Sequence, residues 1–434
     1  MRQSSWILGV LFAIWLAGAH SAIGSEVKGG SDESRTVVVW ISLDGWRADY
    51  LDRGASPFLN ELAQQGASSQ ALIPVFPSLT FPSHVSQATG VGVEQHGIPS
   101  NSFYDDETGL FYRYPGDAAL LEAEPIWLTA ARQGLRVASL DWTLSHNQLG
   151  PIRTDYFDPA FDGQLSDSDR LNRLLSVWRD DRGDEPLRLL LGYGSGLDKA
   201  GHSYGPDAPE VNEAIQEIDK ILKHFHADLL ELWRTKMSPD DQLILLITTD
   251  HGMSTVTTMV DLDRLAGVER APGVVRLTSG NVGHLFFTER NDPDREGKID
   301  RLIERVNGFD FARAYRRETL PQAWQYRHPT RVGDIVVVVD TGFAFAGRGF
   351  DSADGRVTAP VNEVDGPLGM HGYDPVTNPE MLGAAIVWRF PEPIGGLDLG
   401  PVHSLQLHAT VARLLGIEPA EGARKDGIDL PPSR

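Results

Sequence analysis

Six aspartate and histidine side chains could bind metal: five stand at or shortly after the ends of apolar runs, and His371 lies in the segment GMHGYDP. They are Asp44, Asp198, His202, Asp250, His251 and His371. Imidazole nitrogens and carboxylate oxygens are both suitable zinc ligands. Taken singly, an Asp after a strand usually forms a turn or caps a helix, and a lone His is usually a surface residue or a hydrogen-bonded core residue. The adjacent pair Asp250 and His251 favours a metal site, and the six residues together with Thr80 predict a two-metal centre.

Thr80 is the candidate nucleophile. It stands between Pro77 and Pro82 in the segment FPSLTFPSH. A threonine followed by proline is typical of a capped helix start. A hydroxyl at a helix N-terminus also faces the positive end of the helix dipole, where phosphate binds well. Both interpretations stay open on this segment alone.

The chain must bring these side chains together through its strands. Continuous Val, Ile and Leu runs without alternation indicate strands buried on both faces, and helical patterns lie between them. This alternation predicts an α/β fold, with a doubly wound, mostly parallel sheet flanked by helices and ligands beyond the carboxyl ends of the strands. Residues 254–365 change pattern and predict a smaller αβ insertion. The expected strands are 37–45, 135–142, 187–198, 243–252 and 384–390.

Composition restricts the class of protein. The 434 residues carry 39 Lys plus Arg against 60 Asp plus Glu, a formal net charge of −21. Such an acidic chain is not expected to bind nucleic-acid polymers, because that binding needs many cationic contacts with phosphates. A small-molecule substrate is expected instead, and the sequence does not indicate an oligomeric state.

The N-terminal segment predicts export. Residues 1–24 show the order of a secretory signal peptide: one Arg, a short apolar run and then small residues. We expect a catalytic domain over 30–434, a periplasmic or secreted location in a bacterium, and no stable membrane insertion after cleavage. The chain has no Cys, which is compatible with export because a domain of this size does not need disulfides.

Several short motifs occur in one order along the chain: LDG at 43–45, PSLTFPSH at 77–84, HGI at 96–98, DKAGH at 198–202, DHGM at 250–253 and HGYDP at 371–375. With this set the chain resembles the nucleotide pyrophosphatase/phosphodiesterase family of the alkaline phosphatase superfamily. The resemblance extends over about residues 37–419. It implies an alkaline-phosphatase-like fold and a two-zinc hydrolase of phosphodiester or pyrophosphate bonds in nucleotide-type substrates.

The resemblance also implies roles for individual residues. Asp198, His202 and His371 would hold one Zn²⁺. Asp44, Asp250 and His251 would hold the second, with the Thr80 oxygen as a further ligand and a phospho-threonine intermediate. The Asn101 amide would bind a phosphoryl oxygen, and Phe81 and Tyr193 would enclose a nucleotide base. His84 and His96 are interpreted as structural.

Two segments depart from the family pattern. LDWTLSHNQ and YGSGLD stand where family members usually have a W-P-G-S-like segment and an acidic Y-x-E-x-x-D. Both line the leaving-group side in the family, so other substrates stay open. The alternatives are hydrolysis of phosphomonoesters, phosphonates or choline phospholipids. A secreted binding protein without catalysis is a further alternative.

Overall fold

The five apolar runs form neighbouring strands of one nine-stranded sheet in the computed structural model, which describes residues 34–269, 271–347, 350 and 355–432. The predicted signal peptide, 1–24, lies outside the described residues. The strand order is β19-β2-β18-β8-β1-β7-β5-β6, with β20 also paired to β2. The strands are β1 (Thr36–Leu43), β2 (Ala67–Ile73), β5 (Arg136–Ser139), β6 (Tyr156–Phe157), β7 (Leu187–Gly194), β8 (Gln242–Thr249), β18 (Gly383–Phe390), β19 (Leu397–Asp398) and β20 (Val402–His403).

Strand direction in this sheet is mixed. Strand β1 is parallel to both β7 and β8, and β5 is parallel to both β6 and β7. Strand β18 runs antiparallel to β8 and to β2. The predicted α/β class, with a largely parallel sheet flanked by helices, is confirmed. The direction of β18 was not indicated by its sequence, because a buried apolar run looks the same in either direction.

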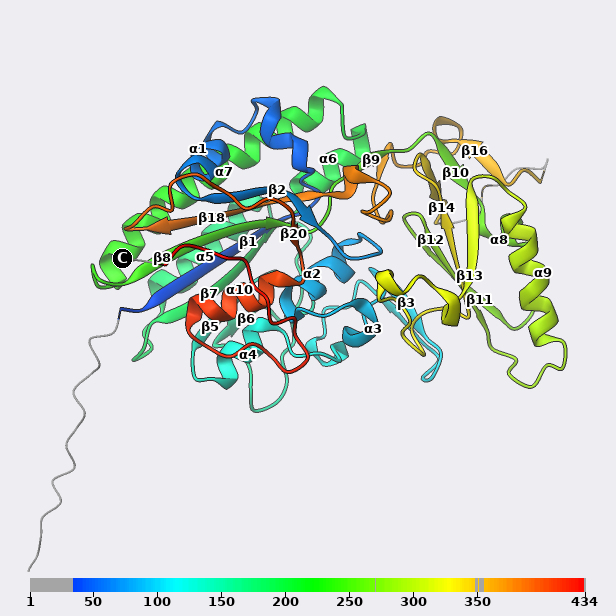
Figure 1. Ribbon diagram of the computed structural model, residues 1–434, viewed down its shortest axis with the longest axis horizontal. Helices are drawn as coiled ribbons and strands as arrows, with labels where there is room; N and C mark the ends of the chain where they lie inside the picture. Colours follow the sequence, from blue (N-terminus) through cyan, green and yellow to red (C-terminus); the bar gives the residue numbers. More distant parts are fainter. Residues whose placement is uncertain (1–33, 270, 348–349, 351–354, 433–434) are drawn as a thin grey trace, which may run out of the picture. The chain divides into compact units, whose positions relative to one another are not determined.

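Helices cover both faces of the sheet (Figure 1). In β1, Val37, Val39 and Ile41 pack toward α1 (Pro57–Gln65), α5 (Asp167–Asp180) and α7 (Pro209–Lys236). Val38 and Trp40 of the same strand pack toward α4 (Ile126–Arg132), α10 (Gln406–Leu415) and the end of α2 (Thr80–Thr89). Alternate residues of a strand point to opposite faces, so a continuous apolar run fills two cores.

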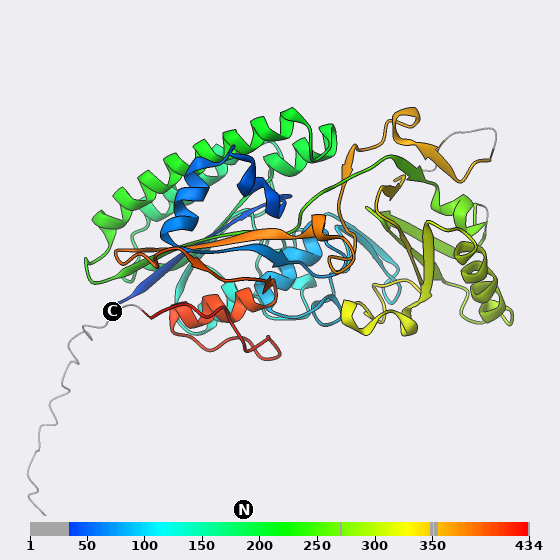
Figure 2. The ribbon, with the colours of Figure 1, turned by 45° about the horizontal axis from the view of Figure 1, so that its top comes forward.

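A second, four-stranded sheet lies within the predicted insertion 254–365. Its order is β11-β12-β14-β13, all antiparallel. In β14, Ile335, Val337 and Val339 pack on the side of α8 and α9, while Val336 packs with Phe76 of the main part. Figures 1 and 2 both show α9 along this sheet. The bounds are β11 (Val274–Ser279), β12 (Val282–Phe287), β13 (Ala312–Arg316), β14 (Ile335–Val339), α8 (Leu262–Ala266) and α9 (Arg295–Asn307).

Further short strands and helices lie outside the two large sheets. Strands β10, β15 and β16 form a small sheet, β9 pairs with β17, and β3 pairs with β4. The insertion boundaries stay a prediction. The bounds of these elements are α3 (Val93–His96), α6 (Gly196–Tyr204), β3 (Ser102–Asp105), β4 (Leu110–Arg113), β9 (Ser254–Thr255), β10 (Thr258–Val260), β15 (Phe343–Phe345), β16 (Thr358–Pro360) and β17 (Gly369–Met370). The 3₁₀ turns are η1 (Ala48–Arg53), η2 (Ala118–Leu120), η3 (Arg317–Thr319), η4 (Gln322–Trp324), η5 (Val361–Glu363) and η6 (Pro379–Met381).

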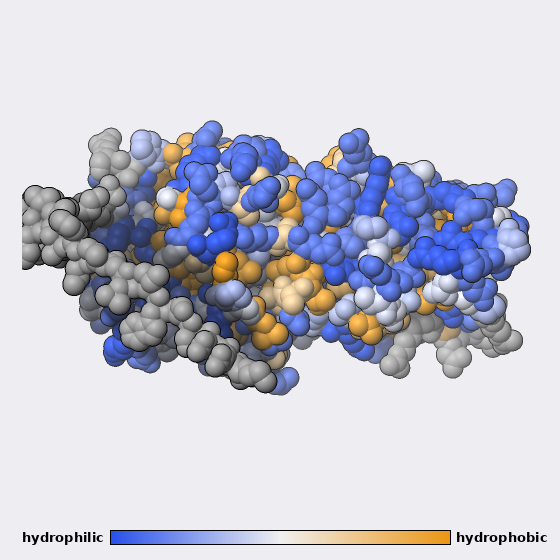
Figure 3. Space-filling model, turned by 90° about the horizontal axis from the view of Figure 1, so that it is seen from below, coloured by the Kyte–Doolittle hydropathy of each residue, from blue (hydrophilic) through white to orange (hydrophobic). Residues whose placement is uncertain are grey.

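The surface seen in Figure 3 is mostly hydrophilic, with apolar residues in small groups between hydrophilic ones. Isolated apolar residues are normal on a protein surface. Among the described residues, no helix combines the length and the apolar character needed to cross a bilayer.

Candidate metal centre

Three adjacent parallel strands bring the acidic residues together. In the pairing register, Leu43 of β1 lies opposite Gly194 of β7 and Thr249 of β8. Asp44 and Asp250 follow directly after β1 and β8, and Asp198 lies in the first turn of α6, just after β7. The carboxyl ends of parallel strands meet at one edge of the sheet, which is where ligands bind in α/β folds. The local sequence therefore places three carboxylates at one edge.

The first group consists of Asp44, Asp250 and His251, and we call it the Asp44 group. The three side chains are buried. Nε2 of His251 lies 3.4 Å from Oδ1 of Asp44 and 3.2 Å from Oδ2 of Asp250. The possible ligand atoms of the group lie within 4.8 Å of one another. This spacing suits three ligands of a single cation.

The second group consists of Asp198, His202 and His371, and we call it the Asp198 group. Asp198 and His202 lie one turn apart on α6, with Nε2 of His202 3.4 Å from Oδ2 of Asp198. Nε2 of His371 lies 3.6 Å from Oδ1 of Asp198. The rings of His251 and His371 stack with centroids 3.6 Å apart, so the two groups adjoin.

In each histidine of the two groups, Nδ1 contacts a backbone carbonyl oxygen. Nδ1 of His202 contacts the carbonyl oxygen of Gly369 at 2.7 Å, Nδ1 of His251 that of Gly252 at 2.9 Å, and Nδ1 of His371 that of Ser78 at 3.0 Å. A carbonyl only accepts, so Nδ1 carries the proton and Nε2 keeps a lone pair. All three Nε2 atoms face carboxylates, which is the orientation of imidazole ligands held by outer partners.

Each carboxylate in the two groups has one buried oxygen that forms no hydrogen bond with any described residue. These atoms are Oδ1 of Asp44, Oδ1 of Asp198 and Oδ2 of Asp250. Buried acceptors are normally satisfied, and an unpaired one needs an explanation such as an ion. The three oxygens and the three Nε2 atoms face one another. The residues present therefore fit two divalent cations.

The electrostatics of the groups point the same way. Burial raises the pKa of Asp44 well above its usual range, and the Asp250 and Asp198 carboxylates raise it further. Burial also raises the pKa of Asp250. Burial lowers the pKa of His251, and it lowers the pKa of His371 to about 4. Neutral imidazoles are the form that binds metal, and a cation would offset the crowded negative charge.

A glycine permits the segment that follows β1 to approach the segment that follows β7 closely. Gly45 has φ +70°, and a Cβ at this position would lie 2.9 Å from Cα of Asp198. Its N–H donates to Oδ1 of Asp250 at 3.1 Å. Any larger residue would push the β1 loop away from Asp198. The LDG motif therefore serves the geometry of both groups.

The Thr80 hydroxyl is not used as a helix cap. Helix α2 begins at Thr80, and the N-cap position belongs to Leu79. The segment does begin a helix, as expected, and Thr80 is the neighbour of the N-cap residue, not the N-cap itself. Pro82 is the third helical residue, where a missing N–H costs nothing. Oγ1 of Thr80 lies 3.4 Å from Nε2 of His251, beside the Asp44 group.

Asn101 holds the start of the same helix from outside. Its Oδ1 accepts a hydrogen bond from the N–H of Phe81 at 2.9 Å. This N–H is one of the donors that a helix N-terminus leaves unpaired. Because Oδ1 faces the helix, the Nδ2 amide remains as the donor side of Asn101. The structure thus places Thr80 and Asn101 together.

His84 lies beneath Thr80 and is fully buried. Its Nδ1 contacts the carbonyl oxygen of Thr80 at 2.8 Å, and its Nε2 contacts Oγ of Ser42 at 2.9 Å. Burial lowers its pKa to about 4, so the ring is neutral. Both nitrogens are occupied, which fits the structural role expected for His84. It ties the first turn of α2 to strand β1.

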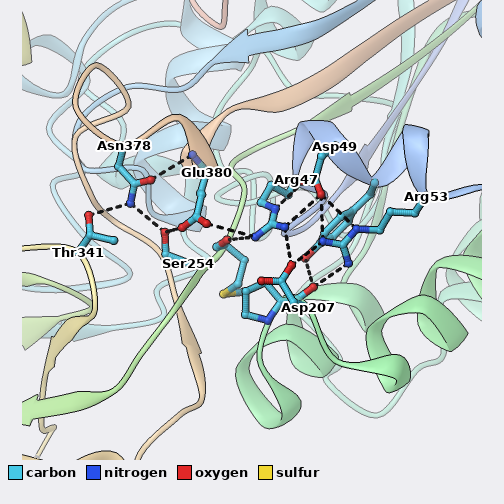
Figure 4. A network of polar contacts seen from close by, with 11 residues as sticks. Arg47, Asp49, Arg53, Asp207, Ser254, Thr341, Asn378 and Glu380 are labelled. Atoms are coloured by element: carbon cyan, nitrogen blue, oxygen red, sulfur yellow. Dashed lines mark hydrogen bonds and ion pairs between the residues drawn. The ribbon is translucent and has the colours of Figure 1, made fainter.

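A polar network supports the loop that carries His251 (Figure 4). Arg47 donates to the carbonyl oxygen of Met253 at 3.2 Å and pairs with Asp49 at 2.5 Å and Asp207 at 2.7 Å. Glu380 lies 3.7 Å from Arg47 and accepts from Ser254 at 2.5 Å. This network was not predicted from the sequence. An Arg shortly after a strand end, beside a DHGM loop, carries no local signal for it.

Phe81 and Tyr193 differ in their surroundings. Phe81 is half-buried and has its ring 5.9 Å from that of Tyr114. Tyr193 is 7% exposed, and its hydroxyl donates a hydrogen bond to Oδ2 of Asp44. The hydroxyl contact was not predicted from sequence. The base-binding role of the two rings stays a prediction.

A cavity of about 710 Å³ borders the site. His202, His371 and Asn101 line it on one side, and residues of the insertion, including Thr278 and Phe345, line it on the other. Its volume falls within the range of small-molecule sites. The insertion therefore contributes to the space in which a substrate could lie.

Comparison with known proteins decides the family. The model of the type I phosphodiesterase/nucleotide pyrophosphatase family matches residues 38–374. This chain belongs to that family. The match includes every residue of the two groups, together with Thr80, Asn101 and the whole predicted insertion. As a member of the family within the alkaline phosphatase superfamily, the protein is a nucleotide pyrophosphatase/phosphodiesterase hydrolase.

Relatives of this phosphodiesterase extend along nearly the whole chain. An uncharacterized pyrophosphatase/phosphodiesterase of Schizosaccharomyces pombe is 28% identical over 94% of this chain and 83% of the relative. The human ectonucleotide pyrophosphatase/phosphodiesterase family member 7 is 26% identical over 96% and 87%. The bis(5′-adenosyl)-triphosphatase enpp4 of Xenopus laevis is 28% identical over 85% and 74%.

Solved structures share the fold. Murine ectonucleotide pyrophosphatase/phosphodiesterase 5, an inactive variant in complex with AMP, has a TM-score of 0.74 at 24% identity, covering 92% of this chain and 98% of the other. The human counterpart has a TM-score of 0.74 at 25% identity, covering 88% and 96%. The alkaline-phosphatase-like fold predicted from the motifs is confirmed.

Proposed function

We propose that this phosphodiesterase hydrolyses phosphodiester or pyrophosphate bonds of nucleotide-type small molecules with two Zn²⁺ ions and a phospho-threonine intermediate. The Asp198 group would hold one ion. The Asp44 group would hold the other, with Thr80 as a further ligand. The observation that carries the proposal is that three histidine Nε2 atoms face the carboxylates of the two groups, with the Thr80 hydroxyl beside them. Each of these carboxylates has one buried oxygen without a hydrogen bond among the described residues.

Zinc fits this donor set better than calcium or magnesium, because three of the seven proposed ligands are imidazole nitrogens. When bound, the two ions would supply positive charge at the attacking oxygen and at the departing oxygen of an in-line displacement. The residues already hold the orientation that such ions require, through the Nδ1 contacts and the backbone bonds to Asp250.

The chain's own residues would perform the following steps. Thr80 Oγ1 bonds to phosphorus while the bond from phosphorus to the leaving oxygen breaks, and the hydroxyl proton passes to solvent. The Nδ2 amide of Asn101 and the N-terminus of α2 stabilise the added negative charge on the phosphoryl oxygens. Water then cleaves the phospho-threonine and restores the hydroxyl.

Nucleotide-type substrates follow from the family, and the murine structure in complex with AMP supports them. The predicted base contacts are Phe81 and Tyr193. Diesters should react faster than monoesters, because the sequence shows no basic or third-metal site for the extra charged oxygen of a monoester. A cation that lines the cavity, Arg356, is already paired with Glu363 at 2.7 Å.

The test is turnover across a panel of substrates by the zinc-loaded protein. The panel holds a nucleoside phosphodiester, a dinucleoside polyphosphate, a nitrophenyl monoester, a phosphonate and a choline phospholipid. We expect the two nucleotide substrates to give the highest kcat/KM. A higher rate on the monoester, the phosphonate or the phospholipid would replace the nucleotide assignment with that alternative. No turnover of any substrate would support the non-catalytic binding protein.

We also propose that the protein is exported, on the basis of the N-terminal 1–24 pattern. Cell fractionation with N-terminal sequencing of the recovered protein tests this. A protein that starts near residue 25 in the periplasm or medium is expected. Full-length protein confined to the cytoplasm would contradict the proposal.

A further inference from the structure

The two carboxylates of the Asp44 group are held in different ways. Oδ1 of Asp250 accepts backbone N–H bonds from Gly45 at 3.1 Å and from His251 at 2.9 Å. Oδ2 of Asp44 accepts from a side chain, the hydroxyl of Tyr193. Oδ1 of Asp44 has no hydrogen-bond partner among the described residues and faces Nε2 of His251 at 3.4 Å. The main chain thus fixes Asp250, whereas Asp44 depends on one phenol.

Tyr193 is rigidly placed for this contact. It is the penultimate residue of β7 and lies opposite Ser42 in the pairing with β1, two residues before Asp44. The ring of His84 packs against its ring at 5.3 Å, and that of Phe161 does so at 6.1 Å. With 7% exposure, the ring has little room to turn. Its hydroxyl therefore stays at Oδ2.

We propose that Tyr193 is a positioning residue for Asp44: its hydroxyl occupies Oδ2, so that Oδ1 is the oxygen presented to the metal. This inference rests on the proposed two-metal function. A carboxylate without a fixed partner can rotate about its last bond and lose its orientation toward the ion. Loss of an outer partner of a metal ligand typically costs 10- to 100-fold in metal affinity.

The hydroxyl and the ring of Tyr193 can be tested separately. Tyr193→Phe removes the hydroxyl and keeps the ring, so the predicted base contact stays. Tyr326→Phe is the matched control. Tyr326 is also buried, and its hydroxyl donates a hydrogen bond to the carbonyl oxygen of Pro99 at 2.7 Å. Its ring packs with residues of the second sheet. Zinc affinity is measured on metal-free protein by competition with a chromophoric chelator.

We expect Tyr193→Phe to bind one of its two zinc ions 10- to 100-fold more weakly, and Tyr326→Phe to bind both as the wild type does. Asp44→Asn supplies the second comparison: adding Tyr193→Phe to it should weaken zinc binding no further. Wild-type affinity in Tyr193→Phe would overturn the inference, and so would a full additional loss in the double variant. A wild-type protein that binds no zinc would instead overturn the proposed function.

Discussion

Buried histidines occur both in the candidate metal centre and in the second sheet, and the groups that contact their ring nitrogens distinguish them. His371 has Nδ1 on a carbonyl and Nε2 facing a carboxylate. His284, in β12, has both nitrogens satisfied: Nδ1 accepts from the N–H of Gly333 at 3.2 Å, and Nε2 contacts the Tyr326 hydroxyl at 3.0 Å. Burial lowers the pKa of each to about 4. Burial and pKa therefore do not distinguish the two histidines, whereas the carboxylate that faces Nε2 of His371 does.

The acidic residues show the same contrast. Asp334, beside the second sheet, accepts from the N–H of Phe287 at 2.7 Å and pairs with Arg295 at 2.7 Å. Asp44 has a buried oxygen with no hydrogen bond and no cationic side chain among its contacts in the described residues. The contacts of Asp334 stabilise the fold. The unpaired buried oxygen of Asp44 is what a cation-binding site would present.

Removal of the Thr80 hydroxyl, the proposed nucleophile, should have the largest effect. Thr80→Ala should lower turnover by about 10⁴-fold or more, because no oxygen remains to form the covalent intermediate. The metal ligands are untouched, so most of the bound zinc should remain. Thr80→Ser should keep measurable activity. Kinetics with elemental analysis of each variant checks this, and near wild-type rates in Thr80→Ala would move the nucleophile elsewhere.

Exchange of a carboxylate for an amide should have different effects in the candidate metal centre and beside the second sheet. Asp250→Asn should lose zinc and activity, because it replaces a charged ligand. Asp334→Asn should keep zinc and activity but lower the free energy of unfolding by about 1–3 kcal/mol, because Arg295 loses its buried partner. Zinc content and denaturant unfolding are measured for both variants. The same pattern of losses in the two variants would remove the distinction drawn between the regions.

Asn101 should affect catalysis through its amide donor. Asn101→Ala and Asn101→Asp should each lower kcat by about 10²- to 10³-fold, the usual cost of removing such a donor. Only Asn101→Ala should also lower stability, by about 1 kcal/mol, since aspartate can still accept from the N–H of Phe81. Steady-state kinetics and thermal melts check both parts. Wild-type turnover in Asn101→Asp would exclude the donor role.

The smallest expected effect is the contribution of His284, in the second sheet, to the pH dependence of the free energy of unfolding. Burial lowers the pKa of His284 to about 4, below the value of about 6.5 in the unfolded chain. Protonation therefore favours unfolding: the contribution of His284 is complete above pH 6.5 and is lost as the pH falls toward 4. His284→Asn should flatten this part of the stability curve between pH 7 and 5. An unchanged slope would show that His284 titrates normally.

The positions of Asp44, Asp198 and Asp250 could be predicted because each follows an apolar run, and such runs end at one edge of a parallel sheet. The expected α/β class followed from the same runs. The direction of β18 could not be predicted, since burial on both faces erases the pattern. The hydroxyl contact from Tyr193 to Asp44 could not be predicted either, because it depends on the register between β7 and β1. His371 lies beyond the insertion, and no local pattern pairs it with Asp198.

The most direct test of the account is the metal content of purified active protein, combined with anomalous diffraction at the zinc edge. The account predicts two zinc ions per chain about 4 Å apart, one at the Asp44 group and one at the Asp198 group, and loss of hydrolysis when a chelator removes them. Full activity in chelator by a protein that contains no transition metal would contradict it.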